Sequence, residues 1–273
     1  MAAVKSAWWA DHTSGEIAAL DKEDLVAVLP VAATEQHGPH LPVSVDTDLI
    51  DAVIARAVQL QQPATPVLYL PTLPYGKSNE HARYPGTISF SAQTLLAAWA
   101  DIAAGVAAAG VRRLVLLNSH GGQAAAMDLL ARDLRERHRM VVVSTSWYQF
   151  GLPAGLFDAE GQRDDLHAGE VETSMMMACA PRWLRLEHAR DFRSRAAQLR
   201  ADGFARLSLH GPGKLAWQVH DLNPLGASGN AAAATVDKGQ AVIDHSARGL
   251  NALLDEVRRL PLDWLDQAPE LLP

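Results

Sequence analysis

The chain has 273 residues, which is enough for one large domain or two small ones. Hydrophobic residues make up 48% and charged residues 20%, so the composition is globular and excludes general disorder. The net charge of -7 disfavours broad nucleic-acid binding, and the single cysteine, Cys179, excludes an internal disulfide and any zinc site built on several cysteines.

Short apolar runs alternate with helix-like stretches along the chain. In chain order we predict a strand at Leu25–Ala32, a helix at Asp46–Leu60, a strand at Val67–Leu70, a helix at Ala92–Gly110, a strand at Val111–Asn118, a helix at Gln123–His138, a strand at Arg139–Ser146 and a helix at His167–Cys179. This alternation predicts an α/β fold with a mostly parallel sheet. We expect one domain over residues 1–273, with residues 180–229 forming an excursion and a loop within it.

No targeting or membrane-spanning segment is predicted. The first residues, Met1–Asp11, lack the apolar core of a signal peptide, and no run of about 18 apolar residues occurs. We therefore expect a cytoplasmic enzyme that acts on a small molecule and binds neither a membrane nor nucleic acid.

Polar clusters follow the four predicted strands. They are Glu35 with His37, the stretch Lys77–Arg83, the stretch Asn118–His120, and Trp147 with Tyr148. Ligands of open parallel sheets bind at the carboxyl ends of the strands, so we expect these loops to converge on one edge.

The densest of these clusters lies in the segment Thr34–Asp48. It contains Glu35, His37, His40, Asp46 and Asp48. Glu35 and His37 are two residues apart, so in extended backbone their side chains point to the same face. Gly38 and the prolines would turn the chain and bring Asp46 back towards them. Imidazoles and carboxylates on a rigid loop suit Zn²⁺, Mn²⁺ or Fe²⁺. The alternative is a polar loop that ends in a helix cap at Asp46 or Thr47.

Three further segments carry candidate residues. In NSHGGQ, His120 follows a buried strand, and Gly121 and Gly122 let the backbone approach a ligand closely. In HAGEVETS, His167 and Glu170 would share a helix face, although acidic residues also favour a helix N-terminus without any other role. In YGKSNEHARYPGT, Ser78, Glu80 and His81 could hydrogen-bond a polar substrate, or the segment is an ordinary surface loop.

Four motifs in this order, LPVAATEQHGPHLPVSVDTD, GKSNEHARYPGT, NSHGGQ and HAGEVETS, resemble the creatininase (creatinine amidohydrolase) family, as does the tail NAAAATVDKG. The resemblance implies a three-layer α/β/α sandwich, a hexamer and a site with two divalent metals, Zn or Mn with Fe as a further option. It implies that Glu35, Asp46 and His120 bind one metal, and that His37 and the bridging Asp46 bind the other. It assigns proton transfer to His167, and it places Trp147 near the substrate.

The sequence departs from creatininase itself at Gly122, where that enzyme has a glutamate that binds the second metal. A replacement ligand is then needed, and Glu170 is the best candidate because it would share a face with His167. Glu172 either orients His167 or acts as a ligand itself.

The function we expect is metal-assisted hydrolysis of a non-peptide C–N bond, in a cyclic amide or a formamide, by a metal-activated water. Ser78, Gly121, Gly122 and Trp147 would contact the substrate, and Gly121 and Gly122 would stabilise the oxyanion. The alternatives are a lactone or other ring-opening hydrolase, a precursor-peptide peptidase, and a non-catalytic metal-binding protein.

Overall fold

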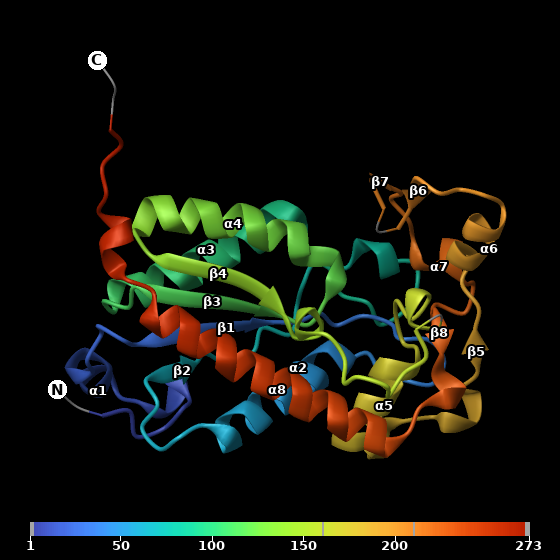
Figure 1. Ribbon diagram of the computed structural model, residues 1–273, viewed down its shortest axis with the longest axis horizontal. Coiled ribbons are helices and arrows are strands. Elements are labelled where there is room, and N and C mark those ends of the chain that lie inside the picture. The colour runs from blue at the N-terminus through green and yellow to red at the C-terminus, as the bar shows by residue number, and fades with distance from the viewer. Residues whose placement is uncertain (1–2, 160, 210, 271–273) are drawn as a thin grey trace.

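A parallel β-sheet forms the centre of the molecule (Figure 1). In the computed structural model, which describes residues 3–159, 161–209 and 211–270, its strand order is β2-β1-β3-β4. These strands are β1 (Val26–Val31), β2 (Val67–Tyr69), β3 (Arg113–Asn118) and β4 (Val141–Ser146), and every neighbouring pair is parallel. All positions of β1 and β3 are buried, because helices cover both faces of the sheet.

The helices make the fold a three-layer α/β/α sandwich, as predicted. One face of the sheet packs against α2 (Val45–Leu60) and α8 (Val236–Arg259), with α5 (Glu170–Cys179) against these two helices. The other face packs against α3 (Ala92–Ala108) and α4 (Ala124–His138) (Figure 1). Within the described ranges, no helix is both long and apolar enough to cross a membrane.

Smaller elements complete the chain. They are α1 (Ser14–Ala19), α6 (Arg195–Ala201), α7 (Val219–Leu222), the antiparallel pair β5 (Asp191–Phe192) and β8 (Gly229–Asn230), and the parallel pair β6 (Leu207–Ser208) and β7 (Gly213–Lys214). Apart from α1, they lie beyond the carboxyl ends of the central strands (Figure 1). This part of the chain therefore stands beside the edge at which the polar loops meet.

Hydrogen bonds join the loops that follow β1 and β2. The Ala32 amide donates to the Leu73 carbonyl at 2.9 Å, and the Ile88 amide donates to the Thr34 carbonyl at 2.9 Å. Two segments that are forty or more residues apart thus have a fixed relative position at the carboxyl edge. The loops after β1 and β2 therefore meet at the carboxyl edge of the sheet, as expected.

The helix predicted to begin at His167 instead begins at Glu170. Ala168 has a left-handed φ of 54°, and Gly169 precedes the first helical residue. His167 itself forms an antiparallel bridge with Ser228. His167 and Glu170 therefore do not share a helix face, which removes the basis for pairing them at one site.

Candidate metal centre

The loop after β1 presents two side chains to the interior of the carboxyl edge. Its ends are joined where the Glu35 amide donates to the Val43 carbonyl at 3.2 Å. His37 Nδ1 lies 3.0 Å from the Glu35 carbonyl oxygen, and a carbonyl only accepts, so Nδ1 carries the hydrogen. His37 Nε2 is then the ring nitrogen that would bind a metal in place of a proton, and it faces Asp46 Oδ1 at 3.7 Å.

Asp46, in the first turn of α2, lies between two histidines that come from different loops. Its Oδ1 faces His37 Nε2 at 3.7 Å, and its Oδ2 faces His120 Nδ1 at 3.6 Å. His120 follows β3, and its Nδ1 is also 3.1 Å from Glu35 Oε2. These four side chains are at most 4% exposed. The geometry suits a carboxylate that bridges two cations.

Two buried atoms of this cluster have no hydrogen-bond partner among the described residues. They are His37 Nε2 and Asp46 Oδ2. A buried polar atom without a partner is costly, so its presence in a cluster of donor atoms indicates a ligand. The side chains therefore fit a metal, and an imidazole–carboxylate donor set suits zinc, manganese or iron.

Glu172, rather than Glu170, completes the group around His37. Glu172 Oε2 lies 3.8 Å from His37 Nε2 and accepts the Ala168 N–H at 2.6 Å. The carboxylate of Glu170 is instead paired with Lys238. His37, Asp46 and Glu172 thus form one possible metal-holding triad, and Glu170 lies outside it.

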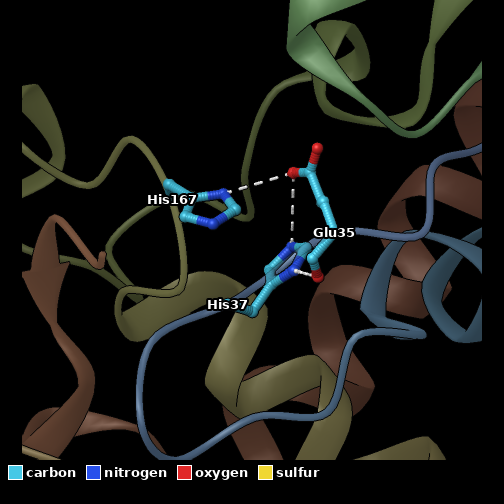
Figure 2. Close-up of side chains that lie close together, drawn as sticks. All are labelled: Glu35, His37 and His167. Carbon is cyan, nitrogen blue, oxygen red and sulfur yellow. Dashed lines mark hydrogen bonds and ion pairs between the residues drawn. The ribbon is translucent and has the colours of Figure 1, made fainter. Parts of the chain in front are cut away.

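His167 stands over the same cluster (Figure 2). Its Nδ1 faces Glu35 Oε1 at 3.7 Å, and its Nε2 donates to the Gln36 carbonyl at 2.8 Å. Its ring lies against the rings of His37 and His81, with centroids 4.1 and 4.3 Å away. Nε2 is thus engaged by the backbone, and Nδ1 is the atom that can exchange a proton with the cavity.

Gln36 is a supporting residue that no motif in the sequence singled out. Its amide nitrogen donates to the Gly226 carbonyl at 2.8 Å and to His81 Nδ1 at 2.8 Å. His81 Nε2 must then carry the hydrogen, and it faces Glu35 Oε1 at 3.5 Å. The only signal in the sequence was the position of Gln36 between Glu35 and His37.

Burial and charge compete throughout the cluster. Burial raises the pKa of Glu35, but the charges of His120 and His81 outweigh it and hold this pKa well below its ordinary value. Burial and the Glu35 charge raise the pKa of Asp46 to about 6. Burial lowers the pKa of His37, but Asp46 and Glu172 raise it to about 9.

The same competition between burial and charge acts on His120 and His167. Burial lowers the pKa of His120, but the Glu35 carboxylate outweighs it, so this pKa lies well above its ordinary value. Burial and the charge of His37 lower the pKa of His167. Protons on His37 and His120 thus balance the buried carboxylates, and a divalent cation at the same atoms would replace that charge.

A cavity of about 390 Å³ opens onto these side chains. Glu35, Glu80, His120 and His167 line its polar side, with the backbone of Gly121 and Gly122, while Leu166, Leu209 and Trp217 are among its apolar residues. An amide could therefore reach the cluster with its polar end while an apolar part contacts the opposite wall.

Two of the side chains predicted to contact substrate, Ser78 and Trp147, are not among the residues that line this cavity. The Ser78 hydroxyl is buried and donates to Glu35, which orients that carboxylate. Trp147 belongs to the core beside α8, and its Nε1 donates to Ser119 Oγ at 3.1 Å. Trp217, which lies between β7 and α7, is the tryptophan among the lining residues of the cavity.

Together, the sandwich and the buried histidine–carboxylate cluster at its carboxyl edge have the architecture of a metal-dependent hydrolase. The family model for creatininase, described as creatinine amidohydrolase, matches residues 10–254. The chain belongs to the creatininase family.

Relatives in this family have different substrates. The mycofactocin precursor peptide peptidase of Mycobacterium tuberculosis is 31% identical over 252 residues, covering 90% of this chain and 88% of its own. The creatinine amidohydrolase of Pseudomonas putida is 34% identical over 184 residues, covering 62% and 69%. A crystal structure of creatininase has a TM-score of 0.72 at 27% identity, covering 94% of this chain and all of its own.

Proposed function

We propose that the chain is a metal-dependent amidohydrolase that cleaves a C–N bond with two divalent ions, zinc or manganese. Glu35, Asp46 and His120 would hold one ion, and His37, Asp46 and Glu172 the other. The observation that carries this proposal is the position of the Asp46 carboxylate. Its two oxygens face two histidines from separate loops, at 3.7 and 3.6 Å. A solved structure of the manganese form of creatininase, with a TM-score of 0.72, supports the choice of metal.

Divalent ions in such a centre lower the pKa of water towards about 7 and polarise a carbonyl oxygen. The side chains of this protein provide the remaining steps. His167 Nδ1, held towards the cavity by the Nε2–H bond to Gln36, accepts the proton of the attacking water and donates it to the departing nitrogen. The amides of Gly121 and Gly122 lie at the cavity wall, where they can stabilise a developing oxyanion.

A peptide substrate is the second candidate. One relative that matches 90% of the chain is named a precursor-peptide peptidase, and the cavity of about 390 Å³ has apolar lining residues that can contact a substrate larger than a small cyclic amide. The restriction to non-peptide bonds is therefore one of two hypotheses about the same centre. A cytoplasmic location and a homohexamer remain predictions.

The test is a substrate panel with protein loaded separately with each metal. Creatinine, N-formyl compounds, hydantoins, lactones and short peptides that end in apolar residues would be compared. We expect the wild type to hydrolyse an amide and to contain two metal ions per chain by elemental analysis. We expect His120→Ala to lose both the hydrolytic activity and the metal binding. Full activity of a metal-free His120→Ala protein would refute the proposal.

A further inference from the structure

The missing side chain of Gly122 creates a space that another residue fills. Gly122 lies in the 3₁₀ turn Gly121–Gln123 that follows β3. A Cβ atom at this position would lie 1.7 Å from Glu80 Oε1 and 2.6 Å from His120 Nε2. The carboxylate of Glu80, from the loop after β2, therefore occupies the volume that any side chain at position 122 would need.

Glu80 contacts the far side of the His120 ring. Its Oε1 lies 3.1 Å from His120 Nε2, and the Lys77 carbonyl oxygen lies 3.0 Å from the same nitrogen. A carbonyl oxygen only accepts, so Nε2 carries a hydrogen. The opposite nitrogen, Nδ1, faces Glu35 Oε2 at 3.1 Å. It is the ring nitrogen that a metal would bind in place of a proton.

We propose that Glu80 is a positioning residue of the metal centre, which acts from the space left by Gly122 to hold His120 with Nδ1 as the ligand atom. This inference rests on the proposed function, because it assigns the orientation of a residue of that centre. A carboxylate that accepts the remote N–H of a metal-binding histidine fixes its tautomer and raises its basicity. The side chains at positions 80 and 122 are therefore mutually exclusive in this fold.

The first experiment measures the affinity of metal-stripped full-length protein for Zn²⁺ by competition with a chromophoric chelator. We expect Glu80→Ala and Gly122→Ala each to weaken Zn²⁺ binding by roughly 10-fold to 100-fold. The double variant should bind no more weakly than Gly122→Ala alone, because the alanine Cβ already displaces the Glu80 carboxylate. Glu80→Gln retains an acceptor oxygen and should lose less, and circular dichroism verifies that each variant is folded.

Gly121→Ala is the matched control. A Cβ atom there would meet only the Tyr148 hydroxyl, at 3.9 Å, so Zn²⁺ affinity should not change. Equal weakening at positions 121 and 122 would show that the turn tolerates no side chain at all and would overturn the assigned role of Glu80.

The second experiment reads the tautomer directly. In zinc-loaded protein, ¹⁵N NMR of the His120 ring should show Nε2 protonated and Nδ1 metal-bound, with His120→Gln identifying the signals. Zinc on Nε2, or unchanged affinity in Glu80→Ala and Gly122→Ala, overturns this inference while the metal centre itself stands. A wild type that binds no metal refutes the proposed function and this inference together.

Discussion

Gly239, near the start of α8, lies where this helix meets α5 with almost no space between the two backbones. A Cβ atom at position 239 would lie 1.9 Å from the Ser174 carbonyl oxygen and 2.3 Å from its carbonyl carbon, far inside the 3.0 Å that Cβ contacts respect. Both contacts are backbone atoms, so no flexible side chain can move away. In Gly239→Ala the two helices must therefore separate.

The change in the free energy of unfolding of Gly239→Ala is the sum of a loss from overpacking and a gain in helix propensity. Overpacking costs about 1–3 kcal/mol, and more where backbone has to shift. Alanine recovers up to about 1 kcal/mol of helix propensity over glycine. We expect Gly239→Ala to lower the free energy of unfolding by about 2 kcal/mol, the upper end of the first range less the second. Gly105→Ala in α3 is the control, because that position is exposed and nothing lies within 4 Å of its Cβ. Only the gain in helix propensity applies there, so this variant should be at least as stable as the wild type.

The assay is urea unfolding followed by circular dichroism, with the midpoint and slope fitted for each protein. The helix that would move also carries Glu172, so Gly239→Ala should weaken Zn²⁺ binding while Gly105→Ala leaves it unchanged. A Gly239→Ala protein as stable as the wild type would refute the close approach of α5 and α8.

Three further predictions concern charge and metal. Burial raises the pKa of Asp165 from 3.8 to about 7, so the stability that its protonated form contributes is complete below pH 3.8 and is lost as pH rises towards about 7. Asp165→Asn should therefore flatten the decline of unfolding free energy over that interval in urea titrations, and an unchanged pH profile would contradict the buried acid. Glu172→Gln should reduce the metal content measured by elemental analysis, whereas Glu170→Gln should retain it, because Glu170 pairs with Lys238; the reverse result would place Glu170 at the centre. Removal of bound metal with a chelator should lower the melting temperature, since the ligands form a site only in the folded chain, and an unchanged melting temperature would count against a metal held by the fold.

Local pattern was sufficient for the four strands and for α2, α3 and α4, whereas α8 was not among the predicted elements. Largely apolar runs correspond to β1, β2, β3 and β4 within a few residues. The first three of these strands are buried at every position, and such strands leave a signal that needs no tertiary information. The same pattern placed Glu35, His37 and His120 just after strands. Since parallel strands end at one edge, their meeting was predictable.

The start of α5 shows where local reasoning failed. The spacing of His167 and Glu170 predicts one helix face only if both residues are helical. A left-handed Ala168 and the bridge of His167 to Ser228 place His167 before the helix. That backbone turn depends on a segment sixty residues away, which no short window of sequence contains.

By itself, the sequence determined the α/β fold with a parallel sheet and the edge at which the polar loops meet, because these follow from the period of apolar residues and the order of elements. The three-layer sandwich was implied by the resemblance to the creatininase family. The tertiary structure alone decided which side chains meet: Glu172 in place of Glu170, Trp217 in place of Trp147, and Glu80 in the space beside Gly122. Those choices depend on distances of a few ångströms between loops remote in sequence, and only the packed chain sets such distances.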